Sequence, residues 1–312
     1  MHPAFSVILL TTLIGAGQGL LLALYAVELG ARFDVLTPAA PVFYIGGSVL
    51  SLVLLAAGLV ASFFHLGRPE RAWRSAAMWR TSWLSREVIV LPAFMAAVFA
   101  YGAAHYLGLA ASVWIGAGAA VLCLALFVCT GMIYACLKFL QEWHTPLTLV
   151  NLLLLGAASG LMLAAAFAAL TAAELIEPLG VAAVITTALA LVARIATLVR
   201  NARIRPKSSL QTAIGIKHPR IAQKSQGLMG GSFNTREFFH GASLRFVRAV
   251  KWIFLLLAFP LPVLLVIAGI AQGASSLLVL AFSVQYLGLL AERWFFFAQA
   301  RHPQNLYYQV IS

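Results

Sequence analysis

Eight long apolar runs constrain this chain more than any other feature of its sequence. An α-helix needs about twenty residues to cross a hydrocarbon core roughly 30 Å thick, and each run reaches that length. Backbone N–H and C=O groups find no water in lipid, so a spanning run must satisfy them internally as a helix. We therefore predict an all-α integral membrane protein with eight transmembrane helices, near residues 5–28, 42–64, 87–109, 112–135, 148–172, 178–199, 252–271 and 275–298.

The composition excludes a large soluble domain. Hydrophobic residues make up 62% of the 312 residues, and charged residues make up 10%. A water-soluble domain with this balance would expose large apolar patches. The net charge of +12 comes from residues between the runs rather than from one basic face, so we expect no nucleic-acid partner. Cys123, Cys129 and Cys136 are too few for an iron–sulfur cluster ligated by four cysteines.

The positions of the basic residues predict the orientation of the chain in a bacterial inner membrane. Assigning alternate loops to opposite sides places twenty of the 21 lysines and arginines on one side and leaves only Arg32 on the other. Short loops rich in lysine and arginine stay in the cytoplasm during insertion. We therefore expect both termini, and the loops after the second, fourth and sixth helices, to face the cytoplasm.

The chain divides into two predicted four-helix bundles. Residues 1–147 hold the first four helices, and residues 148–312 hold the last four with a long basic loop at about 200–251. Glycines and an asparagine in this loop indicate ordered turns. A loop of this length usually binds something, either anionic lipid headgroups or a partner subunit.

A second segment between spans, His65–Glu87, is a predicted interfacial helix. It combines five arginines with Trp73, Trp79 and Trp83. Tryptophan rings and arginine stems favour the headgroup level of a bilayer. An interfacial anchor explains this composition without any active site.

Ionisable side chains at membrane depth are functional candidates, because they are costly unless they are paired or hydrated. His65 closes the second predicted helix and Glu87 opens the third, with Arg68 and Arg86 close in sequence. An imidazole and a carboxylate at one depth suit quinone chemistry, which moves two protons with two electrons. The alternative is that His65 merely reaches the interface and Glu87 pairs with an arginine. Polar groups that complete a pocket in the quinone interpretation are Thr11, Thr12, Gln18 and Tyr134.

Two rival functions receive less support. A haem anchor needs two axial histidines at matching depth, but His65 and His105 fall near opposite ends of their helices. Transporters often show matching helix breaks in their two halves, whereas Pro260 and Pro262 interrupt only the seventh helix. The glycine-rich run Gly15–Gly19 lies inside an apolar span, so we expect close helix packing there rather than nucleotide binding.

Several motifs resemble those of the DMSO reductase membrane anchor subunits, which are related more distantly to the polysulfide-reductase-type anchors. The resemblance spans nearly the whole chain, and its most specific motifs are His65-Leu66-Gly67-Arg68-Pro69 and Thr81-Ser82-Trp83-Leu84-Ser85-Arg86-Glu87. Within the family, the chain looks most like the anchors of cytoplasmic sulfite dehydrogenase complexes. Further matching segments are His2-Pro3, Thr11–Gly19, Trp143–Pro146, Gly230–Gly241, Glu292–Phe297 and Arg301–Pro303.

The resemblance implies a complex of three subunits. A molybdopterin catalytic subunit and a four-cluster iron–sulfur subunit would join this anchor, which would bind ubiquinone or menaquinone and carry no haem or iron–sulfur cluster. The family's quinol-site histidine and glutamate map onto His65 and Glu87, and the helix-four tyrosine of the polysulfide-type anchors maps onto Tyr134. Our own hypothesis adds that Arg68 and Arg86 tune the charge of His65 and Glu87, and that Tyr134 and Gln18 help to orient the ring.

On this interpretation the iron–sulfur subunit docks on the cytoplasmic face against the basic loop. Anchors of S-oxide- or oxyanion-reducing complexes, a purely structural docking subunit and a small-solute transporter remain alternatives. The residues expected to take part in docking are Arg220, Asn234, Arg236, Glu237 and His240.

The orientation predicts where a protease can reach the basic loop. Protease added to inside-out membrane vesicles cleaves between residues 200 and 251, and protease added to intact spheroplasts does not. Immunoblotting of the fragments measures this. Cleavage only in spheroplasts would show that the orientation is opposite to the predicted one and that the docking face lies in the periplasm.

Overall fold

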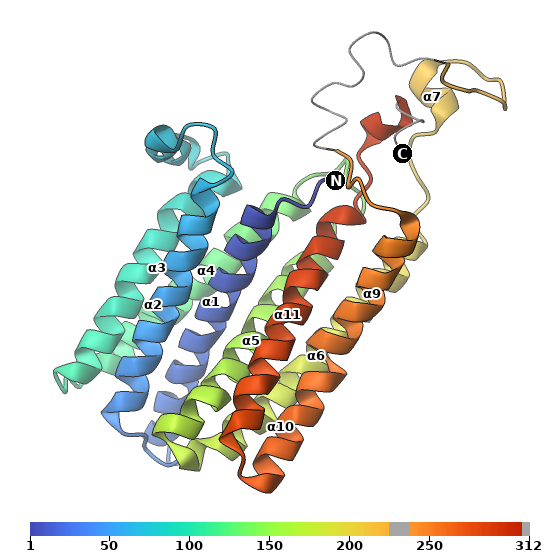
Figure 1. Ribbon diagram of the computed structural model, residues 1–312. Helices are drawn as coiled ribbons and strands as arrows, with labels where there is room; N and C mark the ends of the chain where they lie inside the picture. Colours follow the sequence, from blue (N-terminus) through green and yellow to red (C-terminus); the bar gives the residue numbers. More distant parts are fainter. Residues whose placement is uncertain (225–237, 308–312) are drawn as a thin grey trace.

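The computed structural model describes residues 1–224 and 238–307. Within these ranges all regular secondary structure is helical (Figure 1), and eight helical spans are long and apolar enough to cross a membrane. The predicted all-α membrane fold is therefore confirmed. The spans are α1 (Phe5–Arg32), α2 (Pro41–Phe63), α3 (Trp83–Tyr106), α4 (Ser112–Ala135), α5 (Pro146–Thr171), α6 (Ile176–Ala202), the pair α9 (Leu244–Ala258) and α10 (Pro260–Gln272), and α11 (Ser275–Ala298).

The seventh span begins earlier than the predicted residue 252. The Ser243 hydroxyl caps α9 by accepting a hydrogen bond of 3.2 Å from the Phe246 N–H. The first turns of α9 are amphipathic and carry basic residues, so hydropathy alone assigned them to the loop. The span also breaks at Phe259, because Pro260 has no N–H to continue the helical bonding.

The predicted interfacial helix is shorter than expected and is a 3₁₀-helix, η1 (Pro69–Met78), with no buried residue. Trp73 is 72% exposed. The guanidinium of Arg86 donates to the carbonyl oxygens of Trp79 at 2.9 Å and Arg80 at 2.8 Å, which ties the end of this segment to the start of α3. In Figure 1, η1 stands apart at the upper end of the helices.

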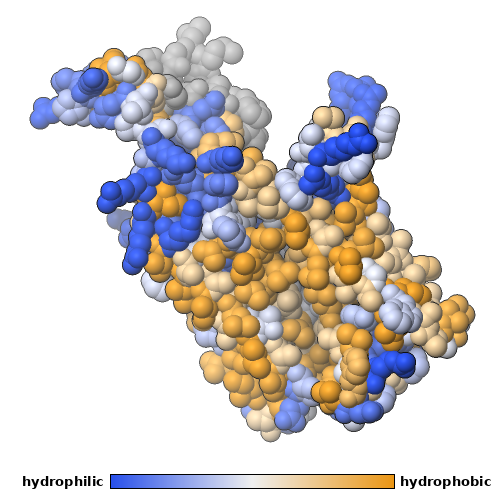
Figure 2. Space-filling view, turned by 180° about the vertical axis from the view of Figure 1, so that it is seen from behind, coloured by the Kyte–Doolittle hydropathy of each residue, from blue (hydrophilic) through white to orange (hydrophobic). Residues whose placement is uncertain are grey.

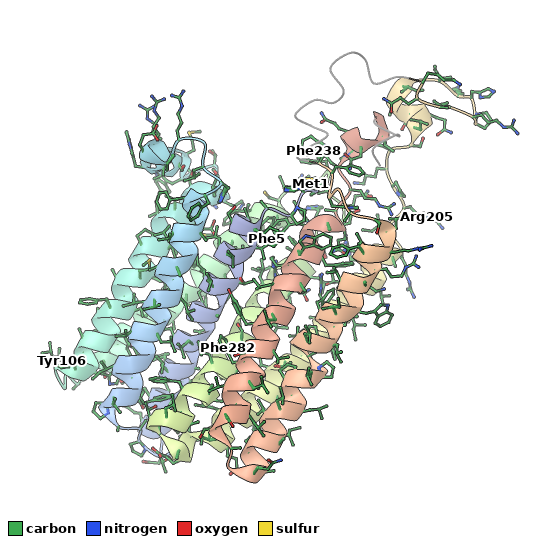
Figure 3. All side chains as sticks on the ribbon, viewed as in Figure 1. Met1, Phe5, Tyr106, Arg205, Phe238 and Phe282 are labelled. Carbon is green, nitrogen blue, oxygen red and sulfur yellow. The ribbon has the colours of Figure 1, made fainter. Side chains whose placement is uncertain are left out.

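Both ends of the described chain lie at this same end of the molecule. The Met1 ammonium group donates a hydrogen bond of 2.8 Å to the carbonyl oxygen of Ala300. Figure 3 labels Met1, Phe238 and Arg205 at this end and Tyr106 at the opposite end. An even number of spans requires this arrangement. Which side of the membrane this end faces stays a prediction.

Helices α1 and α5 form the centre of the fold. Helix α1 contacts α2, α4, α5 and α11, and helix α5 contacts α1, α4, α6 and α11. The two central helices approach closely because glycines face each other. A Cβ added at Gly19 would lie 2.0 Å from the Gly156 carbonyl oxygen, and one added at Gly160 would lie 2.0 Å from the Gly19 carbonyl carbon. The packing role expected for the Gly15–Gly19 run is confirmed.

The surface between the two ends is apolar. Seen from behind in Figure 2, hydrophobic residues cover the middle of the molecule, and hydrophilic residues gather mainly at the upper end. Exposed apolar side chains such as Val53, Phe99 and Leu189 belong to this surface. Such a surface would be unfavourable in water and fits a lipid environment.

The glycine contact predicts a sharp steric effect. Gly160→Ala forces α1 and α5 apart and destabilises the protein by about 1–3 kcal/mol or more. Gly118→Ala is the matched control, because a Cβ at that position meets nothing within 4 Å. Thermal unfolding of both variants in detergent measures the difference. Equal midpoints would show that the two helices do not depend on this contact.

Candidate functional site

A small polar cavity lies where α1, α3, α4, α5 and α11 meet. Its volume is about 30 Å³, which holds water rather than an aromatic ring. Apolar side chains such as Phe127 and Leu152 form part of the wall. The polar side chains that line it are Thr11, Thr12, Gln18, Glu87, Thr130, Ser159, Glu292 and Arg293.

Glu87 is the carboxylate that the sequence singled out, and it lines this cavity near the start of α3. The Ser82 side chain caps α3 by accepting from the Ser85 N–H, which fixes the register that turns Glu87 inward. The Thr130 hydroxyl of α4 donates to Glu87 Oε1. Among the described residues, Glu87 makes no ion pair. The alternative in which it pairs with an arginine is therefore wrong for this structure.

The two arginines expected near Glu87 and His65 point to other groups. Arg86 donates hydrogen bonds to the carbonyl oxygens of Trp79 and Arg80, just beyond η1. Its guanidinium lies 4.2 Å from the centre of the Trp83 ring. Arg68 is exposed at the start of η1. A charge-tuning role for either one stays a prediction.

His65 lies just beyond α2 and is largely exposed. It does not line the cavity that holds Glu87. Partial burial of its ring lowers the pKa of the imidazole below its ordinary value. This shift favours the neutral imidazole, which has one N–H donor and one nitrogen acceptor.

Gln18 and Tyr134 occupy different places around the cavity. Gln18 lines it, and its amide nitrogen donates 3.0 Å to the carbonyl oxygen of Cys123 in α4. Tyr134 lies outside the lining, in an aromatic cluster with ring centres 5.3 Å from Trp143 and 5.3 Å from Phe296.

Three buried charges beside the cavity were not predicted as site residues. Arg194 and Glu292 are each 1% exposed, and Arg293 is 5% exposed. Arg194 lies 2.9 Å from Glu292 Oε1, and Arg293 lies 3.2 Å from Glu292 Oε2. We call these residues the α6–α11 charge cluster.

Sequence reasoning counted Arg194 and Arg293 among the cytoplasmic loop charges, and this is corrected. Both lie inside helices, in the predicted runs 178–199 and 275–298. A general rule could have identified both arginines, because an ionisable residue within an apolar run is a candidate functional residue. Eighteen basic residues still oppose Arg32, so the predicted orientation is unchanged.

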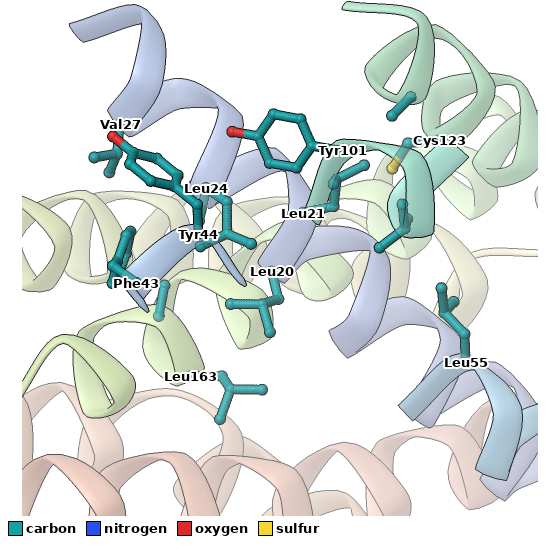
Figure 4. Close-up of a cluster of buried hydrophobic side chains, with 14 of the residues drawn as sticks. Leu20, Leu21, Leu24, Val27, Phe43, Tyr44, Leu55, Tyr101, Cys123 and Leu163 are labelled. Carbon is teal, nitrogen blue, oxygen red and sulfur yellow. The ribbon is translucent and has the colours of Figure 1, made fainter. Parts of the chain in front are cut away.

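A second buried polar cluster lies at the opposite end of α1 to α4. The Ser112 hydroxyl donates to Glu28 Oε1 at 2.5 Å, and His105 Nε2 lies 3.5 Å from the same oxygen. The His105 ring stacks on Tyr44 at 4.2 Å and meets the edge of Tyr101 at 4.7 Å. Figure 4 shows both tyrosines among the buried apolar side chains of this region.

Only part of the predicted docking segment lies within the described residues. Arg220 is exposed, and its N–H donates to His218 Nδ1 at 3.0 Å. His240 accepts from the Ala242 N–H at 3.1 Å. The neighbouring Phe238 stacks on His302, with ring centres 3.7 Å apart, so this segment contacts the end of the chain. Asn234, Arg236 and Glu237 lie outside the described residues.

No metal centre is present in the described part of the chain. None of its groups of histidine, cysteine, aspartate or glutamate brings three or more residues together as metal ligands. The cysteines Cys123, Cys129 and Cys136 are all free thiols.

These features define a multi-pass helical membrane protein with buried polar groups near the end that carries its basic segments. The chain belongs to the family described as DMSO reductase anchor subunit (DmsC), which it matches over residues 1–298. It is 57% identical, over 325 aligned positions covering 100% of both chains, to a sulfite dehydrogenase subunit of Allochromatium vinosum. The resemblance drawn from the motifs is confirmed.

The second polar cluster predicts a stability defect. His105→Ala removes two ring contacts and leaves Glu28 buried without its nearest base, so we expect a loss of about 2–4 kcal/mol. His218→Ala, on an exposed histidine, is the matched control. Thermal unfolding in detergent compares them. Identical midpoints would mean that His105 does not support the buried carboxylate.

Proposed function

We propose that this chain is the quinone-binding membrane anchor of a molybdopterin iron–sulfur complex that oxidises sulfite. The family match supports the role of a membrane anchor subunit, and the similarity to a sulfite dehydrogenase subunit supports sulfite as the substrate of the complex. The observation that carries quinone binding is Glu87. It is a carboxylate at the end of a membrane helix, bonded to a threonine hydroxyl and bordering a cavity large enough for water.

The residues around Glu87 fit a quinone head group. Its carbonyl oxygens need hydrogen-bonding groups that can also transfer protons, and Glu87 offers such a group near the membrane edge. The cavity itself, at about 30 Å³, is too small for the ring. Glu87 and His65 would therefore hold the head group outside this cavity.

When bound, quinone supplies a carrier of two electrons and two protons. Glu87 holds one proton at its carboxylate, and the hydroxyl of Thr130 fixes the direction of that carboxylate. Neutral His65 relays a second proton, because it both donates and accepts hydrogen bonds. Water bound in this cavity, which Gln18 and the threonines line, would restore protons to Glu87.

Partner binding follows from the distribution of charge. The basic segment after α6 and the arginines of η1 lie at the same end of the molecule as Glu87. An iron–sulfur subunit docked at this end, with contacts to Arg220 and His240, would bring a cluster close to the quinone. In this proposal that end faces the cytoplasm of a bacterial inner membrane, and the molybdopterin subunit binds beyond the iron–sulfur subunit.

The proposal predicts that Glu87→Gln slows quinone-coupled sulfite oxidation by about a hundredfold, because amide nitrogen and oxygen cannot exchange the proton. Turnover of the purified complex with quinone measures this, and turnover with an artificial dye acceptor tests that the soluble subunits remain intact. Glu70→Gln is the matched control, since Glu70 is exposed on η1 at the same end.

The His65→Ala and Glu87→Gln double variant separates this proposal from a purely structural role. Retained electron transfer to quinone in an assembled double variant would show that the chain docks its partners without taking part in redox chemistry. Loss of quinone turnover with full dye turnover supports the quinone site.

A further inference from the structure

The α6–α11 charge cluster carries one more positive charge than negative. A single carboxylate, Glu292, faces the guanidinium groups of Arg194 and Arg293, and all three residues are almost completely buried. An ion pair of one arginine and one glutamate would suffice to bind α6 to α11. The second buried arginine is costly at membrane depth and needs another explanation.

The two arginines have different surroundings. Arg194 pairs with Glu292 at the shorter distance, 2.9 Å, and its guanidinium lies 5.3 Å from the Phe254 ring centre and 5.9 Å from that of Phe295. It is enclosed by α9 and α11 and does not line the polar cavity. Arg194 is therefore the structural partner of Glu292.

Arg293 lines the polar cavity together with Glu87. Its guanidinium lies 3.2 Å from Glu292 Oε2 and 4.8 Å from the centre of the Phe296 ring, so its position is fixed from two sides. Of the residues that line the cavity, Glu87 is the one carboxylate apart from Glu292.

Arg293 belongs to a cluster with one excess positive charge, and Glu87 makes no ion pair among the described residues. Both side chains line the same cavity. Glu87 is partly buried and Arg293 is buried. Coulomb interactions between such groups are screened less than those at an exposed surface. Charges held in place before a reaction stabilise new charge without reorganisation.

We propose that Arg293 is a positioning residue for the Glu87 site. Glu292 and Arg194 hold its charge against the cavity, where it stabilises negative charge on Glu87 and, through Glu87, on the reduced oxygen of a bound quinone. This inference rests on the proposed quinone site, but its effect on Glu87 can be measured without turnover.

The test compares Arg293→Gln with Arg293→Lys in the purified complex. We expect Arg293→Gln to lower quinone-coupled turnover about tenfold or more, while turnover with the dye acceptor stays unchanged. The pH at which turnover is half-maximal and the pH at which the infrared band of the protonated Glu87 carboxyl disappears both move upward. Arg293→Lys restores most of the activity and both pH values. Arg301→Gln, at an exposed arginine of the same end, is the control.

A second variant tests whether a general loss of stability explains these shifts. Glu292→Gln adds one unneutralised positive charge, so the carboxyl band of Glu87 should disappear at a lower pH than in the native complex. A damaged fold does not explain shifts of opposite sign in the two variants. Band positions that match the native complex in both variants would overturn the role of Arg293.

The outcomes also separate this inference from the proposed function. Suppose that Glu87→Gln is inactive with quinone while Arg293→Gln has native turnover and a native pH profile. This result supports the quinone site and contradicts the role of Arg293. If Glu87→Gln is fully active with quinone, the proposed function fails. In that case, the carboxyl band alone shows whether Arg293 acts on Glu87.

Discussion

The contact between the backbones of α1 and α5 is the constraint on which the rest of this structure depends. Glycines on both helices remove the side chains that would keep the axes apart. In a lipid environment, close backbone packing of this kind replaces the hydrophobic effect as a source of helix association. Because α11 contacts both central helices, it brings Glu292 and Arg293 to the cavity that Glu87 enters from α3.

Two clusters of polar side chains lie near opposite ends of the helices. At the end that carries the basic segments, Glu87, Thr130, Glu292 and Arg293 border a space large enough for water. At the other end, Glu28 is enclosed by Ser112, His105 and two tyrosine rings. The first arrangement suits exchange of protons with a ligand or water, and the second suits a closed helix junction.

The family relationship and the geometry contribute different parts of the functional argument. Membership of the anchor family comes from similarity along nearly the whole chain. The geometry adds that Glu87 makes no ion pair within the described residues, that His65 stands apart from the cavity, and that two buried arginines share one carboxylate. The proton transfer proposed for Glu87 therefore depends on local electrostatics, which the family name alone does not address.

The sequence by itself determined the number of spans and the segments that connect them, and it singled out Glu87 and Gln18, which line one cavity in the structure. Length, apolarity and an isolated charge are local properties, so each can be recognised without knowing which helices touch. Tertiary structure decided that Glu87 bonds Thr130 rather than an arginine and that Arg194 and Arg293 are buried. Those contacts join residues far apart in the chain, and they depend on the rotation and neighbours of each helix. Hydropathy carries little of that information, because most helix faces here are apolar whether they meet lipid or protein.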